Sequence, residues 1–262
     1  MTNDKPLNPL EMLAYILSLQ IRDHQVVYVG TGLPMVAAIL AKKTHAPHIT
    51  MVYESGGLNP IPGDMPWSVG CPFTWRKAAL IQEMAYSFAQ VYNGFVDIAF
   101  LGFAQVDMYG NVNTHLIGDD FLQPKVRLTG SGGNNDLTSL AENMVLVGLH
   151  TPDKFPARVD FITSVGHLTG GASRREAGLL GNGPIAVVTN AGVFDFEEEN
   201  KRMRVQSLQP GVNFELAQLC TGFELLRPEG EIPVTPAPSP EVLAILRTQV
   251  DPNGVFTSIP GM

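Results

Sequence analysis

Apolar residues recur every three or four positions near the start of the chain, from Leu10 to Ile21. This spacing places them on one face of a helix, which is expected to end near Asp23. Asn8 and Glu11 have the spacing of a capping box, in which each side chain accepts a hydrogen bond from the backbone amide of the other residue. The sequence therefore predicts an amphipathic helix that begins directly after Asn8.

A βαβ unit is predicted next. The apolar run 26–29 is followed by Gly30 and Gly32, then by a helical stretch to about Lys43, and then by a second apolar run, 49–53. Strand, glycine turn, helix and strand in this order are typical of α/β proteins, in which the two strands lie parallel in one sheet.

Later segments predict further elements and two irregular stretches. A helix of about fifteen residues is expected to end near Tyr92, and the Gly- and Pro-rich stretch 56–72 is expected to be an ordered loop beside the site, outside the sheet. Residues 228–240 contain five prolines and predict an extended connector to a C-terminal helix. Strands are expected at 97–102, 145–148, 161–164, 185–189, 193–196 and 203–207, the last two as a hairpin. We interpret residues 1–262 as a single α/β domain.

Composition limits the classes of function. The chain has 262 residues, of which 45% are hydrophobic and 16% are charged, so it is long enough to bury a globular core. No run approaches about 18 consecutive apolar residues and residues 1–8 are polar, so we expect no membrane span, no signal peptide and a cytoplasmic location. The net charge of −8 argues against nucleic acid as the main partner.

Cysteines and histidines give no metal or disulfide pattern. Cys71 and Cys220 are far apart and lack CxxC spacing, so reduced thiols are expected. The six histidines form no HExxH or similar arrangement. No metal site is therefore predicted.

Glu54 is the first candidate reactive group. It directly follows the apolar run 49–53 and precedes Ser55, Gly56 and Gly57. Ligands of open α/β sheets bind outside the carboxyl ends of the strands, and glycines allow a ligand to approach closely. A solvated strand end or a turn cap is the alternative interpretation of this acid.

The turn after the first strand invites a second interpretation. Gly30 and Gly32, with an acid 22 residues after Gly32, suggest a dinucleotide site in which Glu54 holds a ribose hydroxyl. Met35 stands where the third glycine of that motif is required, and Pro34 removes one amide donor from the helix N-terminus. The dinucleotide signal is therefore weak.

A second glycine cluster lies at residues 130–133, with the sequence GSGG. Backbone amides in such a run can surround a phosphate or a developing oxyanion. An ordinary flexible loop explains the cluster equally well when it is considered alone.

Five motifs together carry a family resemblance. GTGLPMVAA, YESGG, LGFAQVDMYGNVN, PKVRLTGSGGNND and GVFDF occur in this order. The chain resembles, over nearly its whole length, the β subunit of class I coenzyme A transferases, most closely of the glutaconate type. This resemblance implies an α/β fold of the NagB/RpiA/CoA transferase-like class, with an open, largely parallel sheet and helices on both faces.

The resemblance also implies a chemistry and a set of site residues. Glu54 would attack an acyl-CoA thioester to give an acyl-glutamyl anhydride and then a glutamyl-CoA thioester, while backbone amides of Gly133 and Asn134 would stabilise the oxyanion. Coenzyme A would be a substrate, with no cofactor bound permanently and no metal. Substrate-binding positions implied by the motifs are Gly30, Gly32, Ser55, Gly56, Gly57, Gln105, Asn111 and Gly132.

Partners and alternatives follow from the same resemblance. An α-type CoA-transferase subunit is expected to complete the site, and the substrates are expected to be an acyl-CoA and a carboxylic acid such as the dicarboxylate glutaconate. The residues that contact CoA stay unassigned, because the available cations are also explained as surface charges; these are Arg174, Arg175, Lys201, Arg202 and Arg204. The alternatives are an acyl-CoA or ring-opening hydrolase on the same scaffold and a non-catalytic metabolite-binding subunit.

Overall fold

The computed structural model describes residues 5–258, so residues 1–4 of the polar N-terminal stretch lie outside the description. The chain divides into two compact units. Unit 1 contains residues 5–100 and 237–258, and unit 2 contains residues 101–236. Whether the units act as a single domain stays a prediction.

The sheet of unit 1 has parallel strands at its centre. β1 (Val26–Val29) pairs in parallel with β2 (Thr50–Tyr53) and with the first residues of β5 (Ile98–Gly102). β3 (Gly57–Leu58) and β4 (Leu80–Ile81) extend the sheet beyond β2 as antiparallel strands. The predicted βαβ unit is confirmed, because α2 (Leu33–Lys43) connects β1 to β2.

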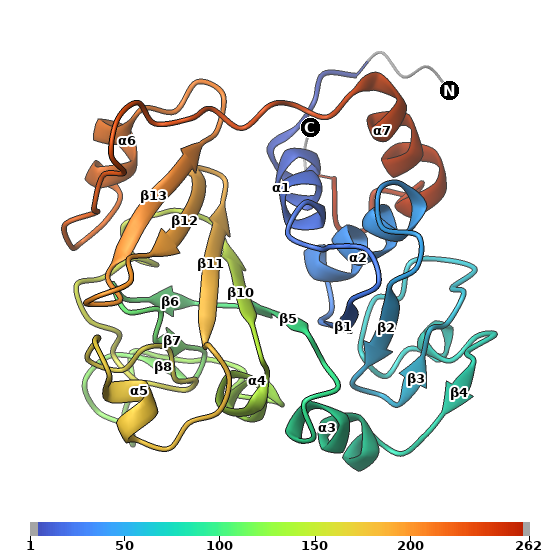
Figure 1. Ribbon diagram of the computed structural model, residues 1–262, viewed down its shortest axis with the longest axis horizontal. Helices are drawn as coiled ribbons and strands as arrows, with labels where there is room; N and C mark the ends of the chain where they lie inside the picture. The colour runs from blue at the N-terminus through green and yellow to red at the C-terminus, as the bar shows by residue number, and fades with distance from the viewer. Residues whose placement is uncertain (1–4, 259–262) are drawn as a thin grey trace. The chain divides into compact units, whose positions relative to one another are not determined.

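Helices lie on two sides of this sheet. Figure 1 shows α1, α2 and α7 grouped on one side of β1 and β2, with α3 on the other. Tyr28 of β1 packs against Phe88 of α3, with ring centroids 5.7 Å apart. The remaining helical bounds are Pro9–Ser18 for α1, Met84–Tyr92 for α3, Pro240–Ile245 for α7, Pro72–Thr74 for the short 3-10 helix η1 and Leu246–Val250 for the π-helical turn η2.

Three predictions for unit 1 need correction. α1 has the predicted capping box but ends at Ser18, because the chain then tightens into a turn in which the Ile21 amide donates to the Ser18 carbonyl. α3 has nine residues instead of about fifteen, because the residues before it form β4. Part of the stretch 56–72 joins the sheet as β3, although it was expected to lie outside.

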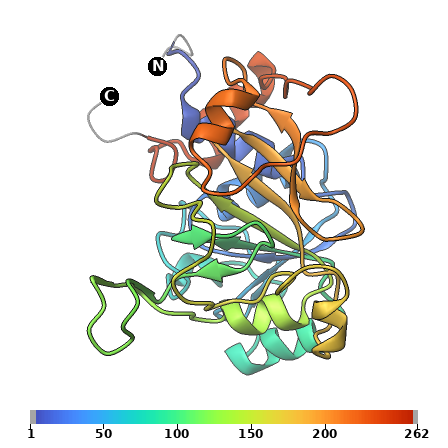
Figure 2. The ribbon, with the colours of Figure 1, turned by 90° about the vertical axis from the view of Figure 1, so that its left-hand side faces the viewer.

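Unit 2 contains the second group of paired strands. β10 and β11 are parallel, and β12 and β13 form the predicted antiparallel hairpin. Two short hairpins, β6–β7 and β8–β9, precede them, and the connection between β8 and β9 projects away from the other strands (Figure 2). The strands are β6 (Gln105–Val106), β7 (Val112–Asn113), β8 (Leu116–Ile117), β9 (Val126–Arg127), β10 (Met144–Gly148), β11 (Pro184–Thr189), β12 (Gly192–Phe196) and β13 (Met203–Leu208); the helices are α4 (Asn134–Leu140), α5 (Ser173–Glu176) and α6 (Phe214–Leu219).

One strand predicted in unit 2 is absent from the described structure. Residues 161–164 form no strand and make only a bridge between Ser164 and Val112. Side-chain contacts hold this segment instead: the ring of Phe161 packs against His115 and Phe121. The segment that was expected to be a strand is therefore held by ring packing and is not paired in a sheet.

The parallel pairing in both units confirms the predicted α/β class. Most apolar side chains of β1, β2, β10 and β11 are buried, as expected of strands covered on both faces, and Ile185 of β11 is the exposed exception. The Pro-rich connector runs extended from unit 2 into unit 1, with one bridge between Leu208 and Val234. Among the described helices, none is both long enough and apolar enough to cross a bilayer.

The π-helical turn η2, which follows α7, is tied to α1 by an ion pair. Arg247 Nε donates to Glu11 Oε1 at 2.7 Å, and a terminal guanidinium nitrogen donates to Glu11 Oε2 at 2.9 Å. Glu11 is only 5% exposed, and its Oε2 also accepts the Asn8 amide of the capping box. One carboxylate therefore holds together two ends of the chain that are distant in sequence.

We predict that Arg247→Ala lowers the free energy of unfolding by about 2 kcal/mol, because Glu11 would remain buried without its cation. Trp67 and Trp75, the chain's two tryptophans, both lie in unit 1, so urea titration followed by tryptophan fluorescence reports the unfolding of this unit. Arg22→Ala, at an exposed arginine of the same unit, is the control. Equal losses in the two variants would contradict the prediction.

Candidate active site

Glu54 is the first residue beyond β2, at the carboxyl end of the parallel strands of unit 1. The register pairs Val29 with Tyr53, so Gly30 and Glu54 each follow the last paired residue of their strands. This is the edge at which ligands of open α/β sheets bind. The structure thus places Glu54 beside the first glycine turn.

The Glu54 side chain is half-buried and has no counter-ion in the part of the chain that the structure describes. Within residues 5–258, no donor or cation pairs with its carboxylate. Burial raises the pKa of Glu54 above its ordinary value of 4.5, because removal from water penalises the charged form. When ionised, this carboxylate is therefore less solvated than a surface glutamate, which favours nucleophilic attack.

The loop after Glu54 is held by residues 74–82 of the same unit. Ser55 Oγ lies 2.9 Å from Thr74 Oγ1, and the Trp75 indole donates to the Ser55 carbonyl at 3.0 Å. The Gln82 amide donates to the Gly56 carbonyl at 3.1 Å. These bonds fix the backbone that directly follows the nucleophile candidate.

Gly56 and Gly57 are required by packing within this loop. A Cβ at Gly56 would overlap the Gln82 carbonyl, and a Cβ at Gly57 would overlap the Thr74 carbonyl. Gly56 also has φ +102°, a conformation that residues with side chains rarely adopt. The two glycines therefore allow the backbone of residues 74 and 82 to pack against this loop. A contact of Ser55, Gly56 or Gly57 with substrate stays a prediction.

The first glycine turn is built in a similar way. A Cβ at Gly30 would lie 3.1 Å from the Phe100 carbonyl oxygen, so this position is tight. Gly32 has φ +88° and precedes α2, where its carbonyl accepts the amides of Met35 and Val36. No atom lies within 4 Å of the place that a Cβ at Gly32 would occupy, so crowding does not require a glycine there. The positive φ of Gly32 does.

The second glycine cluster lies in unit 2 and leads into α4. Thr114 fixes its start: the Gly130 amide donates to the Thr114 carbonyl at 2.9 Å, and the Thr114 hydroxyl donates to the Gly130 carbonyl at 2.8 Å. Gly132 has φ +51° and is exposed, whereas Gly133 is buried. The Asn134 amide donates to the Ser131 carbonyl, while the Gly133 amide donates to no other described residue. Of the two predicted oxyanion donors, Gly133 is therefore the one whose amide is available.

Gln105 and Asn111 take part in a buried polar network of unit 2. Gln105 Oε1 accepts from Asn113 Nδ2 at 2.7 Å and from the Asp160 amide at 3.0 Å. Asn111 Nδ2 donates to Asp107 Oδ2 at 2.9 Å, and Asn111 Oδ1 accepts the Gly166 amide at 3.0 Å. These side chains organise the loops around β6 and β7, and direct contact with substrate stays a prediction.

Arg127 is a site candidate that the sequence analysis missed. It lines a cleft of about 670 Å³ in unit 2, together with Asn134 of the predicted oxyanion pair. Arg127 donates to the Phe121 carbonyl, and its guanidinium lies 4.9 Å from the centroid of the Phe121 ring. It is the charged side chain among the lining residues, which are Gly102, Phe103, Ala104, Thr114, Arg127, Leu128, Thr129 and Asn134.

Two of the basic residues considered from the sequence have structural partners within unit 2. Arg174 is 6% exposed and donates to the carbonyls of Gly166, Thr138 and Leu180. Arg204 forms a two-point ion pair with Asp195. Arg174 and Arg204 are therefore committed to the fold of unit 2.

Comparison with known proteins assigns the family. Residues 10–216 match the coenzyme A transferase family. The chain is 36% identical over 258 residues to the B subunit of glutaconate CoA-transferase of Acidaminococcus fermentans, covering 95% of each chain. It is 35% identical over 238 residues to the B subunit of 3-oxoadipate CoA-transferase of Pseudomonas knackmussii, covering 90% of this chain and 91% of the relative. The crystal structure of glutaconate coenzyme A-transferase from A. fermentans matches with a TM-score of 0.90 at 35% identity, over 97% of this chain and 98% of that chain. The chain therefore belongs to the coenzyme A transferase family.

Proposed function

We propose that this chain carries the nucleophile of a two-chain CoA-transferase that moves coenzyme A between an acyl-CoA and a dicarboxylic acid. One observation carries the proposal: Glu54 is a half-buried carboxylate without a counter-ion among the described residues, at the edge of a parallel sheet where ligands usually bind. Family membership and similarity to the B subunits of two CoA-transferases support it.

The proposed reaction proceeds through two covalent intermediates. The Glu54 carboxylate attacks the thioester carbonyl, expels the CoA thiolate and forms an acyl-glutamyl anhydride. The thiolate then attacks the glutamyl carbonyl, which gives a glutamyl-CoA thioester and releases the first acid as its carboxylate. A second carboxylate attacks this thioester and reverses the two steps, so CoA is transferred without net hydrolysis and Glu54 is regenerated.

Each part of the site has a physical role in this scheme. Partial burial strips water from the Glu54 carboxylate, and the bonds from Thr74, Trp75 and Gln82 hold the loop that follows it. Such positioning can contribute on the order of 7 kcal/mol to lowering a barrier. We propose that the Gly133 amide, with that of Asn134 once it is released from Ser131, donates to the oxyanion, where loss of one donor typically costs about 3 kcal/mol.

Arg127 supports the choice of a dicarboxylate. When one carboxylate of such an acid is joined to CoA, the other stays charged and needs a cation. Arg127 is exposed in the cleft that Asn134 also lines, and its planar guanidinium is suited to bind a carboxylate through two hydrogen bonds. Glutaconate and 3-oxoadipate, in the names of the two relatives, are both dicarboxylates.

The proposed partner is an α-type chain of the same family. β4 is the outer strand of the unit 1 sheet, and its exposed apolar side chains continue onto α3. Exposed apolar patches at sheet edges are typical of interaction surfaces. Gln82, between β4 and α3, is bonded to Gly56, so this surface is continuous with the Glu54 loop. The apolar members are Leu80, Ile81, Met84 and Tyr86, exposed by 49%, 61%, 55% and 62%.

We predict that Glu54→Gln lowers transfer activity at least about 1000-fold in the complex with the α-type chain, because the amide is a much weaker nucleophile. Borohydride should inactivate the wild-type complex only in the presence of acyl-CoA, since it reduces the glutamyl-CoA thioester. Mass spectrometry of quenched complex should show Glu54 heavier by one CoA less one water.

Glu241→Gln is the matched control, because it makes the same change at an exposed glutamate of the same unit, outside the surface proposed for the α-type chain. Glu54→Gln should be at least as stable as the wild type, because it removes a charge that burial disfavours. Release of free CoA without an acceptor acid would instead support the hydrolase. Full activity in Glu54→Gln would contradict the proposal, because it would show that Glu54 is not the nucleophile.

The pH dependence of the first half-reaction follows from the raised pKa of Glu54. The carboxylate form attacks, so kcat/KM for acyl-CoA should fall as pH drops through this pKa. Because burial raises the pKa, the midpoint of the fall should lie above 4.5, the ordinary glutamate value. Stopped-flow measurement of CoA release across pH tests this, and a midpoint at or below the ordinary value would contradict it.

Arg127→Gln is predicted to raise KM for a dicarboxylate acceptor about 10- to 100-fold, the range expected from loss of charge-assisted hydrogen bonds. KM for a monocarboxylate of similar length should change little, because it lacks the second charge. Arg175→Gln, at an exposed arginine outside the cleft, is the control. If both acceptors lose affinity equally in Arg127→Gln, this arginine does not select the dicarboxylate.

A further inference from the structure

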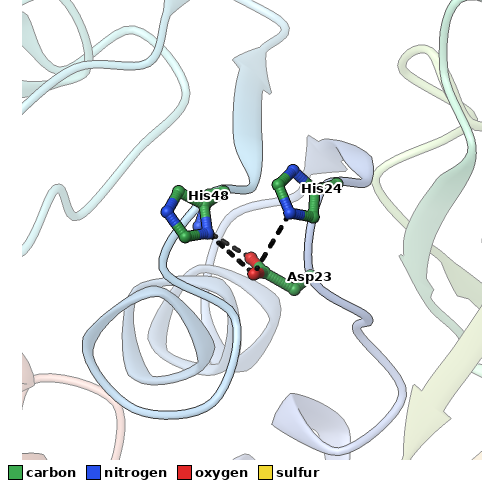
Figure 3. Close-up of side chains that lie close together, drawn as sticks. All are labelled: Asp23, His24 and His48. Atoms are coloured by element: carbon green, nitrogen blue, oxygen red, sulfur yellow. Dashed lines mark hydrogen bonds and ion pairs between the residues drawn. The ribbon is translucent and has the colours of Figure 1, made fainter.

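Three potential metal ligands meet at the end of the unit 1 sheet opposite Glu54. Asp23 and His24 lie in the turn before β1, and His48 lies just before β2. The parallel register pairs Val26 with Thr50, which brings the amino ends of the two strands together. Figure 3 shows the carboxylate of Asp23 facing a ring nitrogen of each histidine.

The distances between these atoms suit a shared ion. Asp23 Oδ2 lies 2.8 Å from His48 Nδ1 and 3.6 Å from His24 Nε2. All three ligand atoms lie within 4.8 Å of one another. Ligands bound to zinc at about 2.0–2.2 Å are separated by roughly 3–4 Å, so small shifts of these atoms would allow all three to bind one ion. The side chains of His24 and His48 are 78% and 64% exposed, which leaves room for the required ring rotation.

The carboxylate is already oriented for this role. Asp23 Oδ1 accepts the backbone amide of His48 at 2.7 Å, which leaves Oδ2 directed at the two rings. Hydrogen bonds to the remaining oxygen of a metal ligand are the usual means of fixing its direction.

The histidine rings are arranged together as well. Their centroids are 4.8 Å apart and their planes differ by 6°. His24 adopts φ +67°, a backbone conformation uncommon for residues other than glycine. This local geometry presents both rings on one side of the carboxylate.

We propose that Asp23, His24 and His48 bind one transition-metal dication, with zinc the best match to two imidazoles and one carboxylate. The exposed side of the ion would be completed by water. The bound ion would link the two loops that lead into β1 and β2 and thereby stabilise unit 1. Glu54 lies beyond the opposite end of β2, so this site is independent of the proposed transferase chemistry.

The test is titration of the full chain, purified with chelator, with zinc chloride alone. Calorimetry should show one zinc ion per chain with micromolar or tighter affinity, and zinc should raise the Tm of unit 1, followed by tryptophan fluorescence. His24→Ala, His48→Ala and Asp23→Asn should each weaken binding at least tenfold, as expected for loss of one of three ligands. Each should also lose the zinc-dependent rise in Tm.

His45→Gln is the control, because it removes one exposed imidazole near the cluster but outside it. The chelator-treated variants should match the wild type in fluorescence and far-ultraviolet circular dichroism, which shows that they fold. Cobalt substitution adds a direct readout, since visible absorption bands should appear in the wild type and in His45→Gln only. Equal zinc affinity in the wild type, His24→Ala and His48→Ala would overturn the proposal, as would the absence of binding to the wild type.

Discussion

The site depends on keeping one carboxylate partly out of water without a cation beside it. Glu54 satisfies this condition because β2 is buried and ends directly before it. Burial raises the pKa of Glu54, which means that the ionised form is less favourable in the folded protein than in water. The hydrogen-bonded loop after Glu54 keeps the residue at the sheet edge where ligands of open α/β sheets bind.

That loop explains why glycines follow the acid. From the sequence, Gly56 and Gly57 were interpreted as space for a ligand. In the structure the same space is filled by the carbonyls of Gln82 and Thr74. The closeness of the two backbones allows β3 and β4 to extend the sheet, and this places an exposed apolar surface next to the proposed nucleophile. A partner bound to that surface would exclude water from the thioester, which would further favour attack by the carboxylate.

Sequence reasoning predicted the elements whose signals are local. The capping box of α1, the βαβ unit around Gly30 and the hairpin of β12 and β13 all follow from spacing within a few residues, and all are confirmed. β3 and β4 were missed because each has two residues, too few to show a period, and because they pair across an irregular loop. Arg127 was missed for a similar reason, since only the folding of its hairpin places it beside Asn134 in one cleft.

The cluster of Asp23, His24 and His48 was also missed, because the fold and not the sequence spacing brings these residues together. His24 and His48 are 24 residues apart, and no spacing motif connects them, so the sequence predicted no metal site. The β1–β2 register that sets Gly30 beside Glu54 at one end also brings Asp23, His24 and His48 together at the other. Four-residue strands separate these ends by roughly 13 Å at about 3.3 Å per residue. A cation held at the amino ends would therefore not neutralise Glu54 directly, so the proposed cation site and the proposed nucleophile are compatible within one strand pair.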